Sequence, residues 1–101
     1  STCMYGSAYN PRIDVEWDPE KAASNLLKHG VDFADAVTAL EDEAALTRAD
    51  PDAQGEDRFV SLGMDAQGRI LVTVFSHRSD SVRVISSRKA SPAERRLYGE
   101  D

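Results

Sequence analysis

The chain has 101 residues, of which 41% are hydrophobic and 30% charged, and its formal net charge is −6. This length predicts a single domain, and no apolar run approaches the roughly 20 residues that a membrane-spanning helix needs. The single cysteine, Cys3, cannot form an internal disulfide, so we expect a soluble protein in a reducing compartment, the cytoplasm.

Residues 1–10 show no hydrophobic periodicity, and they have neither the basic nor the apolar region of a secretory signal. We therefore interpret them as a disordered or vector-derived extension. The rest, residues 11–101, is predicted to form a single domain without internal repeats or low-complexity segments.

The first half of the domain predicts a strand followed by two helices. Residues 13–17 alternate apolar and acidic side chains, as a half-buried strand does. Asp18-Pro19 then supplies a cap and a proline at the first helical position, and Gly30 ends this helix in a left-handed cap. A second helix begins at Asp32. Its predicted buried stripe comprises Phe33, Ala36, Val37 and Leu40.

The second half predicts a sheet and a last helix. A short edge strand is expected at residues 44–47, and stronger strands follow at 58–64, 70–76 and 82–87. The loops between the stronger strands are short enough for hairpins. A capping box at 91–94 begins a short final helix. The predicted fold class is therefore α+β, an antiparallel meander sheet with two N-terminal helices and a short C-terminal helix packed on it.

The basic side chains are concentrated in the last third of the chain. Residues 69–96 carry seven basic and two acidic side chains, whereas residues 1–68 carry five basic and fourteen acidic ones. A basic face of this kind can hold phosphates even in a protein whose net charge is negative. Charge alone fits a solvated face without a ligand equally well.

The sequence lacks the patterns of several common catalytic classes. His29 and His77 are far apart and Cys3 lies in the predicted extension, so no zinc-like spacing exists. There is also no phosphate-binding glycine loop and no G-x-S-x-G nucleophile motif. We therefore expect neither a metal nor a cofactor.

The remaining candidates are basic and hydrogen-bonding side chains near the ends of the predicted elements. Lys28 and His29 occupy the last turn of the first helix, where the helix dipole favours cations, so a simple charge complement is the favoured interpretation for this pair alone. Arg83 interrupts an apolar strand. It is either a phosphate-binding fork or the structural partner of a carboxylate such as Glu56.

Four further residues are candidates, in two pairs, and Tyr98 is considered with them. Arg88-Lys89 lies where the last strand leads into the last helix, a place where side chains can converge on one cleft. Glu56 and Arg58 begin a neighbouring strand and either lie near Arg83 or form a solvated pair at the strand end. Tyr98 is expected in the core, as are Trp17 and Phe75.

Converging groups of this kind suit the cleavage of RNA without a metal. The ribose 2′-hydroxyl attacks the adjacent phosphate, a base removes its proton, cations stabilise the growing charge, and an acid protonates the leaving 5′-oxygen. Arginine suits the phosphate clamp because it stays charged and offers two parallel donors. Lysine or histidine would need a shifted pKa to act as the base.

Several short motifs follow one another in a characteristic order. The first are Val15-Glu16-Trp17-Asp18, Lys21-Ala22, Asn25, Lys28-His29-Gly30-Val31, Phe33 and Ala36. The later ones are Glu56, Arg58, Gly63, Gly68-Arg69, the run Arg83-Val84-Ile85-Ser86-Ser87-Arg88-Lys89-Ala90, Glu94-Arg95 and Tyr98. In order and spacing, over residues 13–98, these motifs resemble the BrnT toxin family of bacterial type II toxin–antitoxin systems.

This resemblance implies a RelE-like fold and a ribonuclease toxin that is neutralised by a cognate BrnA-like antitoxin. The expected complex is a heterotetramer in which the antitoxin supplies the dimer interface and binds operator DNA, so that the toxin contacts DNA only indirectly. By analogy, the catalytic residues are Lys28, His29, Glu56, Arg58, Arg83 and Arg88. The residues expected to bind RNA are Lys89, Arg78 and Tyr98.

Two alternatives to a ribonuclease toxin stay open. A non-catalytic module could use the same basic face to hold RNA or an acidic partner, and it would show salt-sensitive binding without cleavage. A toxin relic could be kept only for regulation through an antitoxin, and its expression alone would leave cell growth unaffected.

Overall fold

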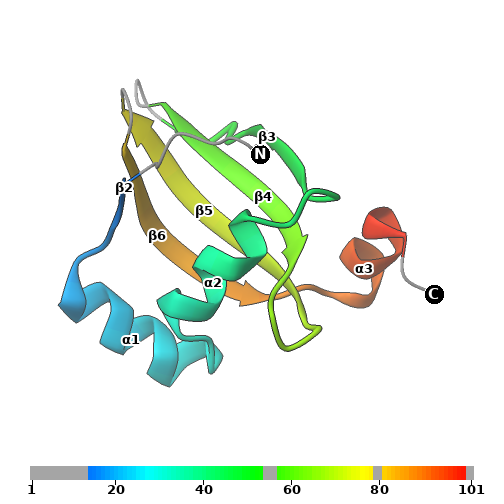
Figure 1. Ribbon diagram of the computed structural model, residues 1–101, viewed down its shortest axis with the longest axis horizontal. Coiled ribbons are helices and arrows are strands. Elements are labelled where there is room, and N and C mark those ends of the chain that lie inside the picture. The colour runs from blue at the N-terminus through cyan, green and yellow to red at the C-terminus, as the bar shows by residue number, and fades with distance from the viewer. Residues whose placement is uncertain (1–13, 54–56, 79–80, 100–101) are drawn as a thin grey trace.

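The described part of the chain forms one sheet and three helices. The computed structural model describes residues 14–53, 57–78 and 81–99, except for the side chain of Arg78 (Figure 1). The predicted extension at residues 1–10 and the candidate Glu56 lie outside the described residues. None of the described helices is long and apolar enough to cross a membrane.

The sheet is mixed, so the predicted antiparallel meander is right for four strands and wrong for the fifth. The strands, in spatial order, are β2 (Asp14–Glu16), β6 (Ser81–Lys89), β5 (Ile70–Arg78), β4 (Arg58–Met64) and β3 (Leu46–Ala49). Neighbours from β3 to β6 pair antiparallel, whereas β2 pairs parallel with β6 at the edge. The hairpin rule covers only strands joined by short loops, and most of the domain separates β2 from β6.

The strand boundaries follow the prediction where the apolar pattern is strong. β4 begins and ends as predicted, and β5 and β6 extend beyond the ranges 70–76 and 82–87. The prediction for β3 is wrong by two residues, because its position is set by pairing with β4, in which Leu46 lies opposite Leu62 and Ala49 opposite Phe59. A strand whose four residues are all exposed has little pattern of its own.

The three helices begin where the sequence predicts, and the first also ends at its predicted cap, Gly30. They are α1 (Pro19–His29), α2 (Phe33–Leu40) and α3 (Pro92–Tyr98). The Asp18 side chain accepts a hydrogen bond from the Glu20 amide at 2.9 Å, and Gly30 has a φ of 70°. The apolar residues of α1 are not its most buried ones. Leu27 is 90% exposed, and Asn25 is the buried residue of this helix.

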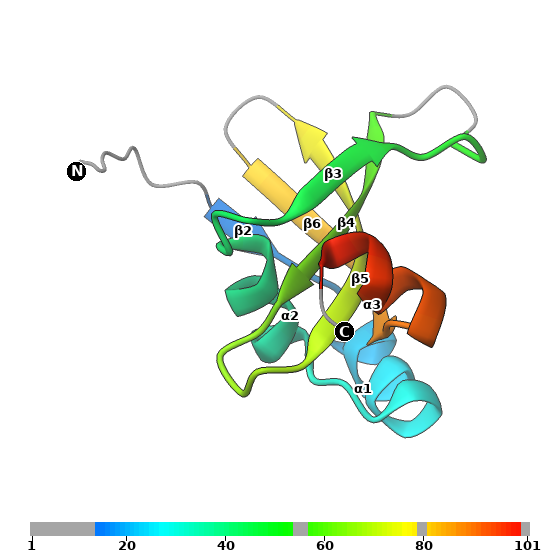
Figure 2. The ribbon, with the colours of Figure 1, turned by 90° about the vertical axis from the view of Figure 1, so that its right-hand side faces the viewer.

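The two faces of the sheet carry different layers. α1 and α2 lie over one face (Figure 1), where Phe33, Ala36 and Val84 form a core cluster. Leu62, Ile70, Val72 and Ala90 form the cluster of the opposite face, against which Tyr98 of α3 packs. In the turned view, β3 and α3 both lie on the side that faces the viewer (Figure 2).

The aromatic residues predicted in the core are half-buried at its margins. Trp17 packs edge-on against Phe33 with ring centroids 6.0 Å apart. Phe75 stacks on Phe59 of the neighbouring strand, with ring centroids 5.7 Å apart.

A register shift between Val74 and Phe75 leaves Ile85 without a partner opposite it in β5, as in a β-bulge.

Candidate functional site

A cavity of about 440 Å³ opens on the sheet face that α1 and α2 leave uncovered. Its floor includes Val60, Val72 and Val74, which point to one face of β4 and β5. Four other elements supply polar side chains to its walls. These side chains are His29 at the end of α1, Arg48 and Asp50 at the end of β3, Arg88 of β6 and Glu94 of α3.

Asn25 fixes the end of α1 against β6. Its side-chain amide donates to the carbonyl oxygens of Val31 at 3.0 Å and Ser87 at 2.8 Å, and its side-chain oxygen accepts from the Ser87 amide at 3.1 Å. His29 follows Asn25 by one helical turn, and Arg88 directly follows Ser87. A single buried side chain thus places His29 and Arg88 at the same cavity.

Arg88 and Glu94 form the shorter of the two ion pairs found among the described residues at the cavity. Nη1 and Nη2 of Arg88 donate to Oε1 and Oε2 of Glu94 at 2.8 and 2.9 Å. The hydrogen bonds from Arg88 are the main reason why the pKa of Glu94 falls to about 2, and the same pair raises the pKa of Arg88. Glu94 is therefore ionised at neutral pH and is unsuited to donate a proton.

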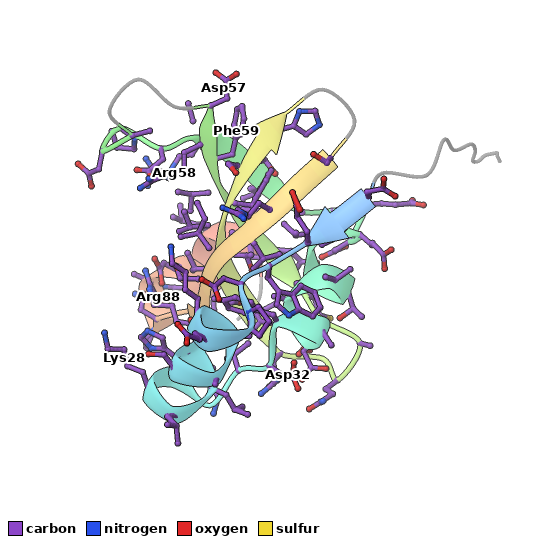
Figure 3. All side chains as sticks on the ribbon, turned by 90° about the vertical axis from the view of Figure 1, so that its left-hand side faces the viewer. Lys28, Asp32, Asp57, Arg58, Phe59 and Arg88 are labelled. Atoms are coloured by element: carbon purple, nitrogen blue, oxygen red, sulfur yellow. The ribbon has the colours of Figure 1, made fainter. Side chains whose placement is uncertain are left out.

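Further arginines line the same face of the sheet. Arg58 and Arg83 both lie opposite Ser76 of β5, one from each neighbouring strand. Arg58 forms a long ion pair of 4.0 Å with Asp50, which itself lines the cavity. Arg83 is exposed and lies opposite Glu16 of β2. Figure 3 shows Lys28, Arg88 and Arg58 along one side of the molecule.

The charges around the cavity are mixed. Arg48, Arg88 and His29 line it together with Asp50, Asp52 and Glu94. Two of these carboxylates are engaged by arginines, Asp50 by Arg58 and Glu94 by Arg88. The field that a bound anion meets is therefore set by individual guanidinium groups and their orientation.

The remaining sequence candidates are Lys28, Lys89, Tyr98 and Arg78. Lys28 is exposed beside His29, and Lys89 is exposed on the strand face opposite to that of Arg88. Tyr98 packs against the core cluster that contains Leu62 and Val72, as expected for a core residue, and its hydroxyl donates to Asp42. That hydrogen bond is the main reason for the lowered pKa of Asp42. The side chain of Arg78 is not among those described.

Sequence reasoning missed several of the lining residues. Arg48, Asp50 and Asp52 lie at the end of an edge strand that carries no strong pattern. Glu94 was predicted as part of a capping box and of a family motif but not as a site residue, and its contact with Arg88 is a second use of the same carboxylate. Among residues 14–53, 57–78 and 81–99 there is no cluster of three or more His, Cys, Asp or Glu side chains that could hold a metal ion.

This arrangement suits the chemistry of a phosphodiester. Guanidinium groups can hold the phosphate, and an imidazole at the rim can transfer a proton. The valine floor offers an apolar surface of a kind on which a nucleobase can lie.

Comparisons with known proteins identify a family and a similar solved structure. The model of a family described as ribonuclease toxin, BrnT, of type II toxin–antitoxin systems matches residues 17–94. Among solved structures, the crystal structure of the Brucella abortus ribonuclease toxin BrnT is similar, with 29% sequence identity and a TM-score of 0.62. That match covers 79% of this chain and 99% of the Brucella chain. A comparison with curated proteins found no match.

Proposed function

Because this chain belongs to the BrnT family of ribonuclease toxins of type II toxin–antitoxin systems, we propose that it cleaves RNA at the cavity beside His29 and Arg88. The reaction is attack of a ribose 2′-hydroxyl on the adjacent phosphate, without a metal ion. The observation that carries this proposal is the hydrogen bonding of Asn25, which joins the end of α1 to β6 and so places an imidazole and a guanidinium at one cavity.

Each group has a proposed role in this reaction. Arg88 holds the scissile phosphate and stabilises the charge that grows on its oxygens, a type of contribution that is often the largest in catalysis. His29 or its neighbour Lys28 exchanges the proton with the 2′-hydroxyl or the leaving oxygen, which typically contributes about 10²–10⁴-fold. Arg58 and Arg83 bind the phosphates that follow along the open face of the sheet.

The roles of the other candidates follow from the family resemblance. Glu56 stays a catalytic candidate on the family resemblance alone, because it lies outside the described residues. Lys89, Arg78 and Tyr98 stay predicted RNA-binding residues. Of these, Tyr98 already has a structural role in its hydrogen bond to Asp42.

A type II toxin acts together with an antitoxin. We propose that the partner is BrnA-like, that the pair forms a heterotetramer, and that only the antitoxin contacts DNA. A RelE-like topology and a cytoplasmic location belong to the same proposal. Co-expression with the neighbouring reading frame tests the partner, because a cognate antitoxin should restore the growth that the toxin alone inhibits.

The cleavage proposal is tested with purified protein and an oligoribonucleotide in the presence of EDTA. We expect products that end in a 2′,3′-cyclic phosphate and a 5′-hydroxyl, and no cut where the scissile ribose lacks its 2′-hydroxyl. His29→Ala and Arg88→Ala should lose most of the activity. Arg83→Ala should lose about 1–3 kcal/mol of transition-state stabilisation if Arg83 binds a phosphate.

His77→Ala is the matched control, because His77 lies on β5 and does not line the cavity. Loss of activity in EDTA, or equal cleavage of the 2′-deoxy substrate, would contradict the mechanism.

One observation favours a second function, a module that binds RNA without cleaving it. Arg58 and Arg88 are both paired with carboxylates, which offset the positive charge that would stabilise a transition state. In that case the purified protein binds the oligoribonucleotide in a salt-sensitive way and leaves it intact.

A further inference from the structure

We propose that Glu94 is a positioning residue for Arg88, and that it presents one free edge of the guanidinium to the substrate phosphate. This inference rests on the proposed ribonuclease function. It assigns to Glu94 a part in the site that neither the sequence analysis nor the family comparison gives it.

The position of Glu94 is itself fixed by the start of α3. Its Oε1 atom accepts a hydrogen bond from the Ser91 amide at 2.8 Å, and its own amide donates to the Ser91 hydroxyl at 3.2 Å. This capping box holds the carboxylate at the N-terminus of the helix. Glu94 can therefore restrain Arg88, whose side chain is 45% exposed and would otherwise sample several rotamers.

The donors of Arg88 divide into two sets. A guanidinium has five N–H groups. Glu94 accepts one from each Nη atom, at 2.8 and 2.9 Å, and the Lys89 carbonyl accepts from Nη1 at 3.3 Å. Within the part of the chain that the structure describes, the Nε hydrogen and one hydrogen of Nη2 have no acceptor, and they point in parallel from the same edge of the guanidinium. Two parallel donors of this kind match two oxygens of one phosphate.

The same contact admits an opposite role, in which Glu94 competes with the phosphate for Arg88. The two roles predict opposite effects on activity when the Glu94 carboxylate is removed. A competing carboxylate lowers substrate affinity, so its removal should tighten binding, an effect that the added positive charge would reinforce. A positioning carboxylate holds Arg88 in the geometry of the transition state, so its removal should slow turnover although the site becomes more positive.

The deciding variant is Glu94→Gln, which keeps the length of the side chain and an oxygen for the capping box. We expect kcat to fall on the order of tenfold to a hundredfold, with KM and the affinity for an uncleavable 2′-deoxy oligonucleotide not improved. The same substitution in an Arg88→Lys background should have little further effect, because lysine has no fork to orient. A role of Glu94 in helix stability alone would lower activity in both backgrounds.

Two controls isolate the ion pair. Ser91→Ala removes the hydroxyl cap of α3 but keeps the Ser91 amide that binds the Glu94 carboxylate, so kcat should fall much less than in Glu94→Gln. Glu43→Gln changes the net charge equally at an exposed residue that does not line the cavity. The inference is overturned if Glu94→Gln leaves kcat unchanged, tightens binding of the 2′-deoxy oligonucleotide, or loses no more activity than Ser91→Ala. If the wild-type protein does not cleave RNA, the proposed function itself fails, a result distinct from an active Glu94→Gln.

Discussion

Among single residues, Asn25 is the one on which the geometry of the cavity most depends. It is 6% exposed, and its amide makes two hydrogen bonds as donor and one as acceptor. Asn25→Asp keeps the shape of the side chain but removes the donor and buries an acidic group. We expect the free energy of unfolding, measured by urea titration, to fall by at least about 1–3 kcal/mol.

Ser24→Ala is the control for this prediction, because Ser24 is exposed on the same helix and should change stability by less than about 0.5 kcal/mol. Cleavage should also fall in Asn25→Asp, since the end of α1 is no longer fixed to β6. Equal stability of the two variants would show that these hydrogen bonds do not hold the helix end.

The Arg88–Glu94 pair predicts an acid-dependent part of the stability. The pKa of Glu94 is lowered from 4.5 to about 2 in the folded protein, chiefly by Arg88. Folding therefore favours the ionised form, so the contribution is complete above pH 4.5 and is lost as the pH falls to about 2. Because both side chains are partly exposed, we expect about 1 kcal/mol or less.

Urea unfolding of the wild type and of Glu94→Gln across this pH range measures the effect. The difference in unfolding free energy between the two proteins should shrink as the pH falls, while other carboxylates such as Asp42 titrate in both. A difference that stays constant down to pH 2 would mean that the ion pair does not stabilise the fold.

The residues that sequence reasoning found most reliably are those whose role is local. Asp18, Gly30 and Ser91 cap their helices as predicted, because a cap depends only on neighbours along the chain. The partners of Asn25 and Arg58 could not be predicted in this way. Asn25 reaches Ser87 across the domain, and Arg58 meets Asp50 only because β3 pairs with β4.

At the scale of elements, the contact between α2 and β4 depends on Gly63. A Cβ atom at Gly63 would lie 2.5 Å from the carbonyl oxygen of Ala39 and 3.2 Å from the Cβ of Ala45. The first contact is with backbone, so no side-chain rotation relieves it. We expect Gly63→Ala to lower the free energy of unfolding by about 1–3 kcal/mol, as overpacking does, measured by urea titration.

Gly68→Ala is a useful comparison for Gly63→Ala. Gly68 has open space around it but a φ of 84°, so its substitution carries only the strain of a left-handed backbone, about 1–2 kcal/mol. If α2 packs on β4 as the structure shows, only Gly63→Ala should also speed hydrogen exchange in α2. Unchanged exchange in that helix would contradict the close approach.

Elements joined by short loops were predictable, and the distant pairings were not. The order from β4 to β6 follows from hairpin loops, whereas the parallel pairing of β2 with β6 brings together segments from opposite ends of the domain. The same difference holds for the residues of the candidate site. His29 and Arg88 were expected from the family resemblance, but the wall formed by β3 became visible only with the sheet in place.

At the scale of the whole molecule, the net charge of −6 opposes the approach of RNA, whereas under the proposed function each arginine of the open sheet face attracts a phosphate. These effects respond to salt in opposite directions. Added salt screens the long-range repulsion, which favours binding, and weakens each phosphate contact, which opposes it. Direct contacts should dominate, because counterion release scales with every phosphate that an arginine neutralises.

We therefore expect kcat/KM for an oligoribonucleotide to fall as KCl is raised. If Arg48, Arg58, Arg83 and Arg88 each bind one phosphate, the slope of log kcat/KM against log salt should be about −3. Arg48→Gln should make this slope shallower by about 0.7, because one contact to a single strand is lost. Lys21→Gln removes the same charge from the first turns of α1, away from the cavity, and should leave the slope as in the wild type. Equal slopes for all three proteins would mean that Arg48 does not contact a phosphate. The salt dependence would then reflect only the net charge of the molecule.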